Sequence, residues 1–214
     1  HVTAAAIEAE TYETARNKIR YDGAVPMCGT VADTVEYDYL QAFTLAAQHL
    51  AGEGPESFPA TDFQEKLPRM MDAFWEVRPS SSTQGVPTEL GLKLEALARE
   101  LSGGDRPAFT EGFRGSYFNT VMGTGGRDGK LLGVLNEDLM GNTNIRYQFD
   151  ANPAMSAEER EFNRTIIRVA PNPSANKKRR DGLRWVPVVN GEFNVPVVSI
   201  HGLGDFYVPF VHQQ

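Results

Sequence analysis

Hydrophobic positions recur at helical spacing through the middle of the chain. Residues 34–52 repeat apolar side chains every three or four positions and end at a glycine, which predicts an amphipathic helix. Residues 155–169 contain Ser156 followed three positions later by Glu159, the spacing of a capping box at a helix start. We therefore expect a mainly helical stretch between residues 30 and 187. The further helical segments that we expect there are 61–77, with an interruption at Pro68, 87–104, and part of 108–123.

Two short runs break this helical pattern. Residues 21–29, "YDGAVPMCG", and residues 195–200, "VPVVSI", are apolar, bounded by glycine, and the second is rich in β-branched side chains. Runs of this kind predict buried strands, and the second one is typical of an inner strand of a mostly parallel sheet. Residues 1–19 are rich in Ala and Glu, which favours a helix. A helix followed by a buried strand indicates an α/β protein.

The residues after the second run carry the candidate chemistry. In "VPVVSIHGLGDFYVPF", Asp205 follows the expected strand within a glycine-containing turn. Functional groups in open α/β sheets gather beyond the carboxyl ends of the strands. An aspartate there can orient a histidine that activates a serine nucleophile. It can equally be a turn-forming residue with no further role, because aspartate is common in turns.

This segment resembles the strand-and-acid segment of the α/β-hydrolases. The N-terminal stretch "HVTAAAIEAETYETARNKIRYDGAVPMCG" is similar to the helix and strand that come after the nucleophile elbow in that family. The resemblance implies an α/β fold, part of an α/β-hydrolase with a mostly parallel sheet and a large helical lid inserted between two core strands. It divides the chain into core at 1–29, lid at 30–187 and core again at 188–214. It also implies that Asp205 is the acid of a catalytic triad.

The chain departs from the family pattern at the other two triad positions. It contains no Gly-x-Ser-x-Gly sequence, and none of its four histidines has the position expected for the triad base. His201 and His212 lie too close to Asp205 in sequence, His49 falls on a lid helix, and His1 would lie just after the elbow. We therefore expect the chain to be a piece of a larger enzyme, inactive alone, whose serine and histidine lie outside these residues.

The function that the resemblance implies is hydrolysis of carboxylic esters through a serine ester intermediate. Alternatives are a serine peptidase or amidase of the same fold, a non-catalytic binding protein of that fold, and an unrelated α/β protein in which Asp205 binds a metal or phosphate. Most lid aromatics are expected to form the lid core, while a minority would face an acyl or aromatic ester. These aromatics are Phe58, Phe63, Phe74, Trp75, Phe109, Phe113, Tyr117 and Phe118.

Composition narrows the possible partners. The net charge of −7 and the pI near 5.2 argue against a nucleic-acid-binding surface, and the one basic run, residues 176–180, is expected to be a solvated loop. No apolar run approaches the roughly 20 residues that span a bilayer. The single cysteine, Cys28, is expected to be a packed hydrophobe at a strand end. We expect a small-molecule ester or acyl substrate, and neither a cofactor nor a metal.

Overall fold

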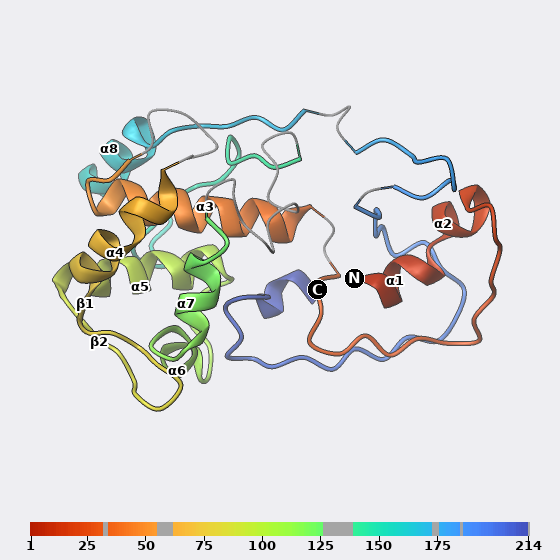
Figure 1. The fold of residues 1–214 in the computed structure, drawn as a ribbon, viewed down its shortest axis with the longest axis horizontal. Coiled ribbons are helices and arrows are strands. Elements are labelled where there is room, and N and C mark those ends of the chain that lie inside the picture. Colours follow the sequence, from red (N-terminus) through yellow and green to blue (C-terminus); the bar gives the residue numbers. More distant parts are fainter. Residues whose placement is uncertain (32–33, 55–61, 126–138, 173–175, 185, 214) are drawn as a thin grey trace.

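The computed structural model describes residues 1–31, 34–54, 62–125, 139–172, 176–184 and 186–213. Helices account for 41% of the described residues, and Figure 1 shows their arrangement. In chain order the elements are α1 (Val2–Ile7), α2 (Ala9–Thr14), α3 (Val35–Leu50), α4 (Phe63–Phe74), β1 (Trp75–Val77), β2 (Val86–Pro87), α5 (Glu89–Leu101), α6 (Phe109–Phe113), α7 (Tyr117–Met122), α8 (Ala157–Thr165) and the 3₁₀ helix η1 (Phe210–Gln213).

The helices α3 to α8 form one body around α3. This helix is buried over most of its length and contributes to two hydrophobic clusters, one shared with α4 to α7 and the other with α8. The capping box predicted at the start of α8 is confirmed: Ser156 Oγ accepts from the Glu159 N–H at 3.1 Å, and Glu159 Oε2 accepts from the Ser156 N–H at 2.6 Å. The helices expected in the middle segment are present, but α4 continues through Pro68 without interruption, and residues 75–77 form the strand β1 instead of the end of a helix.

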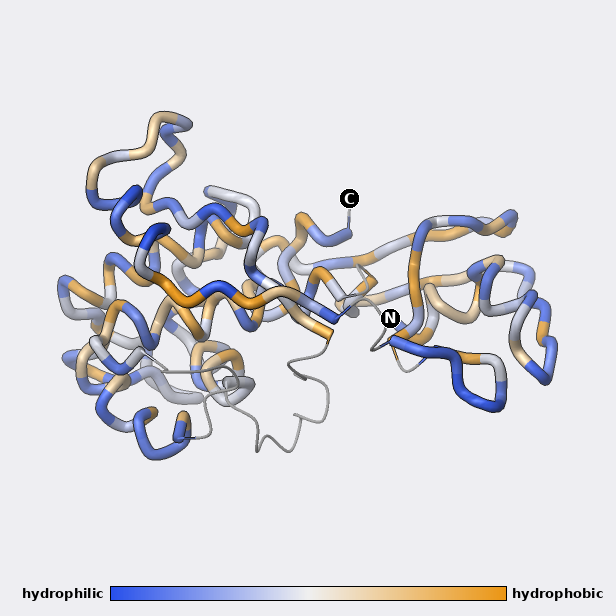
Figure 2. Tube along the Cα trace, turned by 90° about the horizontal axis from the view of Figure 1, so that it is seen from above, coloured by the Kyte–Doolittle hydropathy of each residue, from blue (hydrophilic) through white to orange (hydrophobic). Residues whose placement is uncertain are grey.

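The prediction of a mostly parallel sheet is wrong. Within the described residues the only sheet is the two-stranded antiparallel pair β1–β2. The two apolar runs do lie side by side and in parallel, joined by bridges between Ala24 and Val197 and between Met27 and Ile200. Figure 1 shows these segments running together beside the helical body, and Figure 2 shows them extending to the opposite side of the molecule from it. They form isolated bridges without becoming strands of an α/β-hydrolase core.

Proline and exposure explain why these runs do not form a regular sheet. Pro26 and Pro196 lie inside the two runs and have no N–H to donate to a ladder. Val198 and Ile200 are 60% and 54% exposed, so the expected burial of residues 195–200 on both faces is also wrong. A parallel pair with exposed faces lacks the covering layers on which parallel sheets depend.

Carboxylates of the first two helices hold the distant end of the chain. Glu8 is buried, and its side chain accepts from the backbone N–H groups of Gly191 at 2.7 Å and Glu192 at 3.2 Å. Glu10 binds the Arg184 guanidinium through two hydrogen bonds of 2.8 and 2.9 Å and the Lys178 ammonium at 3.0 Å. These bonds connect α1 and α2 to residues 178–192.

Glu10→Gln tests this connection through its pH dependence. The hydrogen bonds from Arg184, followed by those from Lys178, lower the pKa of Glu10 from 4.5 to about 2. The ionised carboxylate therefore stabilises the folded chain above pH 4.5, and this contribution is lost as the pH falls from 4.5 through about 2. Because the pair is partly exposed, we expect Glu10→Gln to lower the free energy of unfolding by about 1 kcal/mol at pH 7. Urea unfolding between pH 2 and 7 measures the difference.

The matched control is Glu13→Gln on the same helix, because the Glu13 carboxylate makes no ion pair with the described residues. We expect its unfolding free energy to follow that of the unsubstituted protein across this pH range. An equal loss in both variants would show that the Glu10 contacts do not stabilise the folded chain.

Candidate functional site

A cleft of about 650 Å³ contains Asp205 and lies where the C-terminal turn meets the helical body. We call it the Asp205 cleft. Most of the residues that line it are serine, threonine or glycine, and a few are other polar residues. Its lining residues are Cys28, Ser80, Ser81, Ser82, Thr83, Gln84, Ala108, Glu111, Gly112, Gly115, Ser116, Tyr117, Gly202, Gly204 and Asp205. The cleft therefore joins the predicted site residue to the loop before β2 and to α6 and α7.

Asp205 is half-buried and held in one orientation. Its Oδ1 accepts from the backbone N–H groups of Tyr207 at 2.9 Å and Val208 at 3.0 Å, as in a side-chain cap of a turn. No described group donates to its Oδ2. One carboxylate oxygen thus serves the turn, and the other is available as an acceptor.

Arg106 binds the main chain of this turn from the helical body. Its guanidinium donates to the carbonyl oxygens of Leu203 at 2.8 Å, Gly104 at 3.0 Å and Asp205 at 3.1 Å. The same group lies 4.7 Å from the centre of the Phe109 ring, and burial lowers its pKa. Arg106 therefore fixes the backbone that carries Asp205.

The turn also approaches α6 so closely that only glycines fit. A Cβ on Gly112 would lie 2.5 Å from the Gly204 oxygen, and a Cβ on Gly204 would lie 2.6 Å from the Ala108 oxygen. Beside this contact Phe206 is fully buried, with its ring centre 5.4 Å from that of Phe113 and 6.1 Å from that of Phe43. Backbone contact and aromatic packing together set the position of Asp205.

The four histidines are engaged elsewhere. His212 Nδ1 forms a 2.7 Å hydrogen bond with the Glu36 carboxylate, and His201 Nε2 donates to the Val208 oxygen at 2.7 Å. His49 contacts Thr165 at 3.2 Å and is half-buried, and His1 donates to the Pro187 oxygen at 2.8 Å. None of the hydrogen bonds found within the described residues joins a histidine to the Asp205 carboxylate.

The Glu36–His212 pair is a feature that the sequence analysis did not find. Both side chains are nearly inaccessible, at 1% and 9% exposure, and the pair joins α3 to η1. Burial raises the pKa of Glu36, and the hydrogen bond from His212 opposes this shift. The Tyr39 ring lies edge-on to His212, with 5.7 Å between ring centres, and its hydroxyl donates to the Phe206 oxygen. This arrangement secures the chain that follows Asp205.

Cys28 differs from the expectation of a packed hydrophobe. Its side chain is exposed, lines the Asp205 cleft, and its backbone has a left-handed φ of 45°. Such a φ is uncommon for a residue with a Cβ. The Cys28 N–H donates to the Ile200 oxygen at 2.8 Å, which holds the residue at the end of the paired segments. The segment leaves its pairing partner at this point, so the side chain faces solvent instead of a core.

The aromatic residues of the helical body divide largely as expected. Tyr117 is 52% exposed and lines the Asp205 cleft. Phe58 lies outside the described residues, as does most of the glycine-rich segment 123–130. The buried aromatics, which form the core of the body, are Phe63, Phe74, Trp75, Phe109, Phe113 and Phe118.

Comparisons with protein-family models, with curated proteins and with solved structures found no match to the chain. In the described part of the chain, no group of three or more His, Cys, Asp or Glu side chains is arranged to hold a metal ion. No helix there has both the length and the apolar character that crossing a membrane requires.

Gly204→Ala tests whether the close backbone contact positions the Asp205 turn. The added methyl group would overlap the Ala108 backbone, so we expect a destabilisation of about 1–3 kcal/mol. Gly202→Ala is the matched control in the same turn, because its Cβ would meet nothing within 4 Å, and we expect a change within about 0.5 kcal/mol. Chemical unfolding measures both variants. Equal effects would mean that the turn does not rest closely on α6.

Proposed function

We propose that Asp205 is the acid of a Ser–His–Asp triad in a carboxylic ester hydrolase. The observation that supports this proposal best is the state of its carboxylate: one oxygen is held by two backbone N–H groups and the other lacks a described partner, at the wall of a cleft. A triad acid must have a fixed orientation and a free acceptor oxygen for the histidine. The serine and histidine would come from polypeptide outside these 214 residues.

Asp205 would accept the Nδ1–H of that histidine through Oδ2. The bond would fix the imidazole tautomer and stabilise the imidazolium that forms when the histidine takes the serine proton. The serine would then attack the ester carbonyl, release the alcohol and leave an acyl group that water removes. Arg106 and the glycine contact with α6 act as positioning groups, because they bind the turn and not the substrate.

Asp205→Asn in the complete gene product, isolated from its source and identified by intact mass, tests the proposed role. We expect kcat for p-nitrophenyl butyrate to fall by roughly 10,000-fold, because asparagine would select the wrong histidine tautomer. Asp105→Asn is the matched control: this carboxylate is 94% exposed and should leave kcat within about twofold. A loss below about tenfold for Asp205→Asn, or a complete gene product that hydrolyses no ester, would overturn the proposal.

A further inference from the structure

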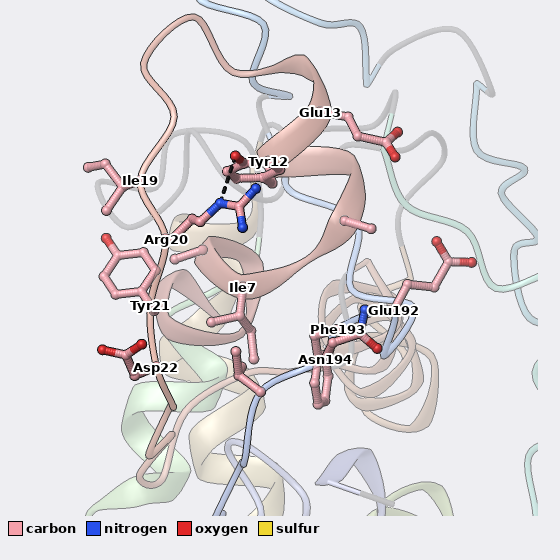
Figure 3. Close-up of a pocket in the computed structure, with 13 residues that line it drawn as sticks. Ile7, Tyr12, Glu13, Ile19, Arg20, Tyr21, Asp22, Glu192, Phe193 and Asn194 are labelled. Atoms are coloured by element: carbon pink, nitrogen blue, oxygen red, sulfur yellow. Dashed lines mark hydrogen bonds between the residues drawn. The ribbon is translucent and has the colours of Figure 1, made fainter.

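A second cleft, of about 430 Å³, lies beside α1 and α2 (Figure 3). We call it the N-terminal cleft. It is formed by α1 and α2, by residues 19–22 and by residues 192–195, segments that are distant in sequence and held together by the Glu8 bonds to Gly191 and Glu192. Its residues are separate from those of the Asp205 cleft.

Apolar and aromatic groups form much of the wall. Ile7 and Phe193 are half-buried, and Val195 adds a further apolar side chain. Figure 3 shows Ile7 between residues 19–22 on one side and residues 192–194 on the other. Tyr21, 45% exposed, belongs to the same wall. Aromatic faces attract both apolar rings and cations, and a volume of this size is within the range of small-molecule sites.

The charged groups of the wall are predominantly acidic. Glu13, Asp22 and Glu192 are exposed carboxylates without a hydrogen bond or ion pair from the side chains of the described residues. The one basic side chain of the lining, Arg20, donates to the Tyr12 hydroxyl at 2.9 Å and lies 5.0 Å from the centre of its ring. The guanidinium is therefore held on Tyr12, and the remaining charge favours a cation.

The ring of Tyr12, at the edge of this cleft, contacts two cationic side chains. Besides Arg20, the Lys18 ammonium lies 5.1 Å from the ring centre and donates to the backbone oxygens of Tyr12 and Glu13. Both of the nearby basic side chains thus bind an aromatic ring instead of a carboxylate of the wall. Tyr21 and Phe193 make no such contact with a cation of the described chain.

We propose that the N-terminal cleft binds an organic cation with an apolar ring, that is, an aromatic ammonium compound. The ring would pack against Ile7, Phe193 and Val195 while the ammonium lies near Asp22 or Glu192. The apolar contacts alone would accept neutral rings as well, so the carboxylates provide the selectivity. This site is independent of the ester chemistry proposed for Asp205.

Titration with tryptamine, which is protonated at pH 7, tests the proposal. The neutral analogue tryptophol and the anionic analogue indole-3-propionate share the ring and differ at the terminal group. We expect tryptamine to bind with a Kd of about 1 mM or tighter and at least about tenfold more tightly than either analogue. Added salt should weaken tryptamine binding, because exposed charges are screened. Calorimetry gives the affinities, and NMR shift changes locate the site.

Variants separate charge selectivity from ring binding. We expect the double substitution Asp22→Asn and Glu192→Gln to weaken tryptamine binding at least fivefold and to leave tryptophol unchanged. Glu76→Gln, an exposed carboxylate on β1, is the control and should change neither affinity. Circular dichroism confirms that each variant is folded. Four outcomes would each overturn the proposal. Tryptamine and tryptophol could bind with equal affinity, or tryptamine could show no saturable binding. The NMR shift changes could be confined to residues outside the cleft, or the double variant could bind tryptamine as tightly as the unsubstituted protein.

Discussion

Insertion of Phe206 into the helical body is the contact on which the arrangement of the candidate site depends. Its ring is fully buried and packs edge-on against Phe43 and Phe109 and at a tilt against Phe113. Aromatic pairs at these separations add about 0.5–1.5 kcal/mol each to the effect of burial. Because Phe206 directly follows Asp205, the packing of one side chain fixes the main chain of its neighbour. The acid is thus supported by the same core that holds the helices together.

The Asp205 turn is held mainly through backbone atoms. Arg106 binds two carbonyl oxygens of the turn, Gly112 and Gly204 bring two main chains together, and the carboxylate itself caps the N–H groups that follow it. Side-chain identity in the turn therefore matters less than the two glycines and the arginine. Both interpretations of Asp205 that the sequence leaves open are compatible with this geometry, since one oxygen forms the turn and the other is available for a partner.

The sequence predicts the helices well because their signals are local. Periodic apolar positions place α3, and the spacing of Ser156 and Glu159 marks the start of α8. The burial predicted for the paired runs is wrong because the burial of a strand depends on the elements that cover it, and the composition of the run does not reveal them. Pro26 and Pro196 are the residues in the sequence that argue against two regular inner strands. The bonds of Arg106 to the Asp205 turn and the Glu36–His212 pair have no local signal, since Leu203 lies 97 positions from Arg106 and His212 lies 176 positions from Glu36. The glycine turn after an apolar run identifies Asp205 but not the groups that support it.

The same long separations bear on how the chain folds. The helices α3 to α8 are formed by contacts among neighbouring segments, whereas the Glu10–Arg184 and Glu8–Gly191 bonds join residues 174 and 183 positions apart. Closing a loop of that length has an entropic cost that must be met before its contacts stabilise anything, and non-local contacts slow folding. The helical body can therefore assemble first, with the paired segments and the two ends of the chain joining it afterwards. In that folding order, the C-terminal segment would attach to a core that has already formed, and Phe206 would be the residue that makes the attachment.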